Sequence, residues 1–207
     1  VASSIVRRLN KILSGRYGER ARGRDLPAAR GTCDVRIYSA AAVDPSFDAR
    51  FSALGRFYAY RVSDRPEPLG RWDRLWVEEN LDEAAMNEAG AALLGEHDFL
   101  GFCRPREGAT TIRTLRTLRA ERDSDGNLVF RVEADAFCHS MVRSLVGALL
   151  LVGSGARDAD YPAQILRARS RSEAAPIAPA HGLTLEGVEY PDPSQWGARA
   201  EQARARR

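Results

Sequence analysis

The sequence predicts a mixed α+β fold, an antiparallel sheet with helices packed on one face. Strand-like and helix-like segments both occur, but they do not alternate as the strand–helix–strand units of a parallel sheet. The composition, 44% hydrophobic and 29% charged, is that of an ordinary globular protein, and 207 residues can bury one sizeable core. The longest apolar run, Leu145–Val152, is too short to span a bilayer, so we expect no membrane association.

The first half of the chain is predicted to contain two helices and two strands. A helix from Ser3 or Ser4 to Leu13 ends at Gly15 and leads into a flexible basic loop over residues 16–30. Alternation predicts strands at 34–38 and, more strongly, at the aromatic segment 56–62. After a loop over 64–74, Asp82 caps a helix that reaches Leu94 and stops at Gly95.

The second half begins with an ambiguous segment, 110–118, in which apolar residues recur every third position but three threonines favour a strand. Asp125-Gly126 predicts a hairpin turn into a strand over 128–133. Residues 139–152 form the most apolar helix, which we expect to be central. Pro162 opens a fourth helix that reaches Ala168, and a strand over 183–190 is expected to bulge at Gly187.

Charge divides the chain into three parts, which we take as domains: a basic helix and loop (1–30), an α/β domain (31–191) and a basic, disordered tail (192–207). The net charge is +3, with +6 in residues 1–30 and +3 in residues 198–207, so the middle carries −6. Lys11 is the single lysine among 31 basic residues. Arginine suits phosphate contacts, although a genome that favours arginine would give the same composition.

Cysteine and histidine are dispersed. Cys33, Cys103 and Cys138 stand far apart, an odd number that argues against a secreted disulfide fold and suits a reducing cytoplasm. The histidines, His97, His139 and His181, show no ligand spacing, so we expect no metal site.

Two segments contain residue types that core packing alone does not require. In the first, Phe47–Ala53 leads into the strand, where Tyr58 and Tyr60 share a face and arginines flank them. Such a tyrosine can stack on an unpaired base, or both tyrosines can belong to the core. In the second, Ala134–Gly147, Arg143 follows His139 by four residues and can share its helix face, or it can be an ordinary exposed charge.

Five segments, in order, resemble the C-terminal part of the TruA-type tRNA pseudouridine synthases, most closely those of high-GC Gram-positive bacteria. The segments are residues 47–60, 95–99, 110–113, 135–147 and 179–185. The resemblance implies the pseudouridine synthase catalytic-domain fold. It also implies a cytoplasmic, homodimeric isomerase that converts uridine to pseudouridine in the tRNA anticodon stem-loop without metal or cofactor. The target base must leave the stack before it can react.

The resemblance assigns roles to several residues. Tyr58 matches the tyrosine that stacks on the target base and assists proton removal. Arg143 matches the basic residue that pairs with the catalytic aspartate, which would keep that carboxylate ionised. Arg50, Arg56 and His139 are expected to contact RNA, and His139 falls near the active site.

The catalytic aspartate itself has no counterpart here. The family carries it in a Gly-Arg-Thr-Asp-Ala-Gly-Val-His motif, and the nearest echo, Gly23-Arg24-Asp25, lacks the threonine and the Gly-Val-His. We therefore expect the chain to be a C-terminal part that is inactive alone. The alternative is a non-catalytic RNA-binding or scaffolding module that retains the fold.

Overall fold

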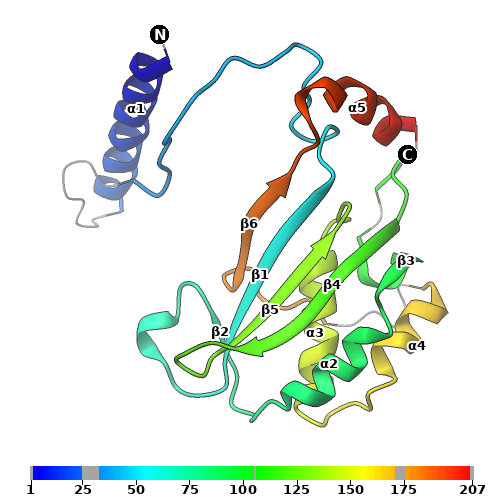
Figure 1. Ribbon diagram of the computed structural model, residues 1–207. Helices are drawn as coiled ribbons and strands as arrows, with labels where there is room; N and C mark the ends of the chain where they lie inside the picture. The colour runs from blue at the N-terminus through cyan, green and yellow to red at the C-terminus, as the bar shows by residue number, and fades with distance from the viewer. Residues whose placement is uncertain (1, 25–32, 105, 171–175, 206–207) are drawn as a thin grey trace. The chain divides into compact units, whose positions relative to one another are not determined.

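The computed structural model describes residues 2–24, 33–104, 106–170 and 176–205 (Figure 1). The chain forms two compact units, residues 1–45 and 46–207. Helix α1 (Ala2–Arg22) belongs to the first unit, and the sheet with the other helices belongs to the second. The boundary predicted after residue 30 lies outside the described residues. None of the described helices is both long and apolar enough to cross a membrane.

The first unit differs from the sequence prediction in two places. Helix α1 continues through Gly15 and Gly18 to Arg22, because the good helix formers around the two glycines outweigh their cost of about 1 kcal/mol each. Residues 34–38 are not a strand. The side-chain amide of Asn10 donates to the Ile37 carbonyl (2.8 Å) and accepts from the Ile37 N–H (2.9 Å), so it occupies the groups that a neighbouring strand would use.

The second unit is built on a six-stranded sheet in the order β2-β1-β5-β4-β3, with β6 also paired to β1. The strands are β1 (Gly55–Ser63), β2 (Leu75–Trp76), β3 (Gly95–Asp98), β4 (Ile112–Arg122), β5 (Leu128–Ala134) and β6 (Leu183–Glu189). The pairs are antiparallel apart from the short β1–β2 pair. This confirms the predicted fold class, and the ambiguous segment 110–118 belongs mostly to strand β4. Strands β2 and β3 were not predicted, because they are too short to show alternation.

Strand β1 confirms the predicted alternation of its side chains. Tyr60 and Val62 are fully buried in the core and Tyr58 packs against it, whereas Arg61 binds Glu186 of β6 on the other face. Opposite Phe57 and Tyr58 the register of β6 jumps from Gly187 to Leu185. The bulge predicted near Gly187 is therefore confirmed.

Helices α2 (Glu83–Ala91), α3 (Met141–Gly153) and α4 (Tyr161–Ala168) lie together on one face of the sheet (Figure 1). Asp82 caps α2 as predicted, because its carboxylate accepts the Ala85 N–H at 3.0 Å. The predicted stripe of α3, which comprises Met141, Val142, Leu145 and Leu149, is at most 4% exposed. This helix begins at Met141 and not at His139.

The C-terminal residues correct the prediction of a disordered tail. They form a short 3-10 helix, Pro193–Gln195, and then α5 (Trp196–Ala205). The Trp196 ring packs 4.7 Å from the Phe47 ring, which also lies 5.1 Å from Tyr190. The charge of this segment predicted a disordered tail, whereas the aromatic residue at the start of α5 fixes it to Phe47.

Gly147 of α3 permits a close approach that a larger residue would prevent. The Ala178 N–H donates to the Arg143 carbonyl at 3.1 Å, and a methyl group at Gly147 would overlap the carbonyl oxygen of Pro176. We expect Gly147→Ala to lower the free energy of unfolding by about 1–3 kcal/mol through overpacking. Urea denaturation measures this. At Gly90 of α2 the nearest atom lies 3.4 Å from the added methyl, so Gly90→Ala is the control and should stay within about 1 kcal/mol of wild type. Equal losses in both variants would contradict this account.

Candidate functional site

A pocket of about 730 Å³ opens at one end of the sheet in the second unit. Its walls come from the turn at residues 50–53, strand β1, the segment 104–113, the β5–α3 connection at 135–140, and helix α5. Six arginines line it, namely Arg50, Arg56, Arg104, Arg106, Arg113 and Arg199, with the carboxylates Glu96 and Asp135. The pocket therefore carries an excess of positive charge.

The two tyrosines of β1 have different environments. The Tyr60 hydroxyl donates to the Pro179 carbonyl at 2.7 Å, and burial raises the Tyr60 pKa to about 12 against the opposing charge of Arg143. Tyr60 is thus the core residue that one interpretation of the sequence expected. Tyr58 lines the pocket, and its ring meets that of Phe137 edge-on at 5.2 Å. Of the pair, Tyr58 is the one placed to meet a ligand.

Arg50 and Arg56, which were predicted to contact RNA, line the pocket together. The Arg56 guanidinium donates to the Asp135 carbonyl at 2.6 Å and to the Arg50 carbonyl. Burial is the main cause that lowers the pKa of Arg56, and the charge of Arg199 adds to it. Arg56 is therefore a fixed cation held by neutral carbonyl groups.

Asp135 organises the start of the β5–α3 connection, a role that sequence reasoning missed. Its Oδ1 accepts the N–H groups of Thr114 (2.9 Å) and Ala136 (2.7 Å), and its own N–H donates to the Thr114 carbonyl. These bonds link the end of β5 to β4, so the chain turns into the pocket at a fixed point. The side chain is acceptor-only when ionised, which explains why backbone N–H groups surround it.

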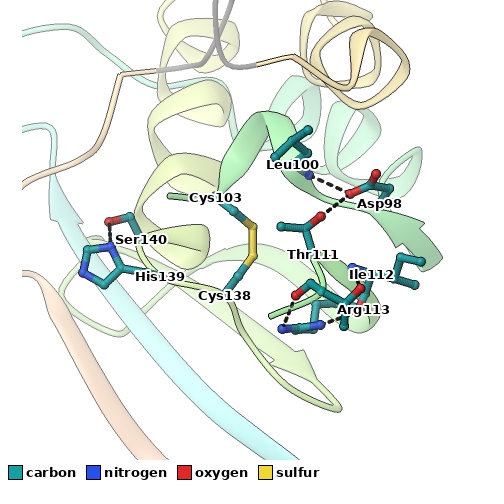
Figure 2. Close-up of a disulfide and its surroundings, with 10 residues drawn as sticks. Asp98, Leu100, Cys103, Thr111, Ile112, Arg113, Cys138, His139 and Ser140 are labelled. Atoms are coloured by element: carbon teal, nitrogen blue, oxygen red, sulfur yellow. Dashed lines mark hydrogen bonds between the residues drawn. A yellow bond between two sulfur atoms is a disulfide. The ribbon is translucent and has the colours of Figure 1, made fainter. Parts of the chain in front are cut away.

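His139 also lines the pocket, but not on a helix. It lies before α3, where its carbonyl accepts the Arg104 N–H at 2.9 Å and its Nδ1 is 3.2 Å from the Ser140 hydroxyl (Figure 2). Ser140 has φ 69°, a conformation that few residues other than glycine adopt. The prediction that His139 and Arg143 share a helix face is therefore wrong.

Arg143 lies in the first turns of α3. Its Nε donates to the Ala178 carbonyl, and its charge acts on Tyr60, two residues along β1 from Tyr58. Arg143 is not among the described residues that line the pocket. That Arg143 and Tyr58 serve one active site stays a prediction.

Sequence reasoning also missed Arg104, Arg106, Arg113 and Arg199 as pocket residues. In an arginine-rich sequence none of them stands out by type or spacing, and the fold alone brings them together. No group of three or more His, Cys, Asp or Glu in the described part of the chain is arranged to hold a metal ion.

Cys103 and Cys138 form a disulfide beside the pocket, with their Cα atoms 5.7 Å apart (Figure 2). The dispersed spacing of the three cysteines gave no indication of this pair, because pairing across 35 residues depends on the fold and cannot be read from spacing. Cys103 follows the 3-10 helix Leu100–Phe102, and Cys138 belongs to the β5–α3 connection. The bond therefore joins the β5–α3 connection, which lines the pocket, to the residue just before Arg104, which lines it from the other side of the bond.

We expect Cys138→Ser to lower the free energy of unfolding in the absence of reductant by about 2–4 kcal/mol, because the bond restricts the unfolded chain. The measurement is urea denaturation with and without reductant, together with peptide mapping of the unreduced chain. Cys33 is a free cysteine in the other unit, so Cys33→Ser is the control and should behave as wild type. Identical unfolding midpoints for the oxidised and reduced wild-type chain would rule out this contribution.

Comparison with known proteins places the chain in a family. Residues 89–191 match the family described as tRNA pseudouridine synthase. The chain is 54% identical over 181 residues to a tRNA pseudouridine synthase A of Streptomyces griseus, which covers 86% of this chain and 64% of the relative. It is 55% identical over 174 residues to the protein of that name from Frankia casuarinae, with 83% and 64% covered.

A third relative extends the match over nearly the whole chain. The tRNA pseudouridine synthase A of Cutibacterium acnes is 45% identical over 210 aligned residues, which cover 99% of this chain and 69% of the relative. The chain thus spans between three fifths and seven tenths of the length of these curated relatives. The sequence identity, the family match and the α+β architecture together show that the chain belongs to the TruA-type tRNA pseudouridine synthase family.

Proposed function

We propose that this chain is the RNA-binding part of a tRNA pseudouridine synthase that isomerises uridine to pseudouridine in the anticodon stem-loop. The proposal includes a cytoplasmic, homodimeric enzyme that needs no metal or cofactor, as the family resemblance implies. Several relatives carry the name tRNA pseudouridine synthase A. The observation that supports RNA binding by this chain is the gathering of six arginines in one pocket that Tyr58 also lines.

Several arginines outside the pocket are paired with carboxylates, although others, such as Arg65, Arg119 and Arg157, are in none of the ion pairs among the described residues. The ion pairs are Arg61–Glu186 (2.7 Å), Arg74–Glu67 (2.8 Å), Arg116–Glu133 (3.1 Å), Arg122–Asp64 (2.6 Å) and Arg131–Glu121 (2.5 Å). By contrast, five pocket arginines form no ion pair with any carboxylate that the structure describes. These five are Arg50, Arg56, Arg104, Arg106 and Arg199. A genome that favours arginine does not by itself explain why six arginines and only two carboxylates line one pocket.

A polyanion would supply the missing negative charge. Guanidinium groups bind phosphates through two parallel hydrogen bonds, and each phosphate bound releases counterions. Tyr58 adds an aromatic face at the same pocket, on which an unstacked base can rest. Phosphate contacts and one stacking ring together fit single-stranded or looped RNA better than a regular duplex, whose bases remain stacked.

In the proposed reaction, Tyr58 holds the extruded uracil and assists proton removal at the carbon that forms the new bond. Arg143 pairs with the nucleophilic aspartate, keeps it ionised and fixes its direction. The printed sequence contains no Gly-Arg-Thr-Asp motif, and Asp25 lies outside the described residues. If the chain acts alone, the missing motif favours the second candidate function, a non-catalytic RNA-binding module.

RNA binding is tested by replacing pocket arginines. The Arg50→Gln/Arg104→Gln chain removes two pocket charges, and the Arg61→Gln/Arg131→Gln chain removes two ion-paired charges as the matched control. Binding to unmodified tRNA and to an anticodon-arm hairpin is measured from low to high salt. We expect the pocket variant to flatten the plot of log affinity against log salt by about 1.4–1.8, since each phosphate contributes about 0.7–0.9. Equal slopes in the two variants would refute the pocket as the RNA site.

We expect the chain alone to form no pseudouridine, because a covalent route needs its nucleophile. Incubation with unmodified tRNA followed by nucleoside analysis measures this. Tyr58→Phe keeps the ring and loses the hydroxyl, so the variant chain should bind RNA as wild type does. Pseudouridine above the level of a protein-free control would show that the chain carries its own nucleophile, and Asp25 would be the first residue to replace.

A further inference from the structure

Helix α5 is fixed to the second unit at both ends. At its start, the Trp196 ring packs on Phe47 and the Trp196 carbonyl accepts the Ser52 hydroxyl at 3.0 Å. Near its end, Arg204 donates to the Asp48 carboxylate at 2.8 Å and stacks over the Phe51 ring at 4.9 Å. The middle of the helix is therefore held in a defined position over the turn at residues 46–52.

The helix presents a different face to the pocket. Ala200 and Arg204 are four residues apart and belong to the docked face, where Ala200 is 1% exposed. Arg199 and Ala203 are also four residues apart, and both line the pocket. Arg204 is thus engaged by Asp48. Arg199 donates to Gln202 of its own helix at 3.4 Å, and its buried Nε has no hydrogen-bond partner among the described residues.

Arg56 of strand β1 supplies a second guanidinium to the pocket that Arg199 lines. Arg56 of β1 is held by the Asp135 and Arg50 carbonyls, and the charge of Arg199 lowers its pKa, after the larger effect of burial. Three groups act in the opposite direction on Arg56: the Tyr190 and Tyr58 hydroxyls and the Asp135 carboxylate. Two cations that stay protonated therefore line one pocket, beside a carboxylate whose oxygen already serves two backbone N–H groups.

We propose that Arg56 and Arg199 form a phosphate-binding site, and that α5 serves to deliver Arg199 to it. The ligand is a phosphate group, which has several acceptor oxygens and the negative charge that two guanidiniums in one pocket need. Its source is a phosphodiester of the RNA backbone, so the inference rests on the proposed function. A free phosphate has the same chemistry, and the experiment separates the two sources.

The test compares Arg199→Gln with the wild-type chain in binding an anticodon-arm hairpin at several salt concentrations. We expect the salt slope to fall by about 0.7–0.9, the share of one phosphate, and the affinity at low salt to fall about tenfold. Arg199→Lys keeps the charge and should keep the slope. Arg119 is exposed on β4 and does not line the pocket, so Arg119→Gln is the control for net charge and should match wild type.

A second variant tests the site independently if Arg199→Gln fails to fold. Ala203→Glu places a carboxylate on the same pocket-facing side of α5 and removes no hydrogen bond, so it should weaken hairpin binding more than Arg199→Gln does. Thermal melting shows whether each variant folds. If Arg199→Gln and Ala203→Glu both fold and bind the hairpin with wild-type slope and affinity, the site is overturned while RNA binding by the chain stands.

Inorganic phosphate distinguishes the remaining outcomes. Isothermal titration of the wild-type chain with phosphate, repeated with Arg199→Gln, measures the site without RNA. If the wild-type chain binds no RNA, the proposed function fails, yet phosphate binding that Arg199→Gln abolishes would support the site with a free phosphate as its ligand. If the wild-type chain binds neither RNA nor phosphate, the site is overturned too.

Discussion

Strand β1 has hydrogen-bond partners along both edges, and the arrangement of the second unit depends on this. One edge pairs with β5, and the other pairs with β6 and then with β2. Because both edges are occupied, the strand cannot shift by one residue without breaking two ladders and turning its core side chains toward the opposite face. That constraint fixes where Arg56 and Tyr58 enter the pocket and where Tyr60 enters the core.

The arginines on the helix-free face of the sheet and those at the pocket have different partners. On the face without helices, Arg61 and Arg131 share Glu186, so their charges are largely neutralised where water also screens them. At the pocket, neutral carbonyl groups position Arg56 while its charge stays available. The chain therefore has a modest net charge but a strongly uneven potential, and such a potential can steer a polyanion toward one region of the surface.

Local sequence patterns correctly predicted the helices, strands and caps that depend on neighbouring residues. They failed to predict the environments of residues that depend on contacts with distant segments. Alternation in β1, the Asp82 cap and the apolar stripe of α3 each follow from neighbouring residues, and all three are confirmed. The assignment of Tyr60 to the core depends on Pro179, more than 100 residues away, so spacing alone left it open. The same holds for the Cys103–Cys138 pair and for Arg199, whose position depends on an aromatic contact between the two ends of the second unit. The extent of α1 was missed because one glycine was given too much weight.

The docking of α5 couples two segments that the chain order keeps far apart. The aromatic contact of Phe47 with Trp196 and the ion pair of Asp48 with Arg204 mean that neither segment can change freely without the other. In evolutionary terms, substitutions in the turn at residues 46–52 and in the C-terminal helix are constrained to occur together. A relative with a different C-terminus would be released from the need for an aromatic residue at position 47 and an acid at position 48, and could rebuild this wall of the pocket from other residues.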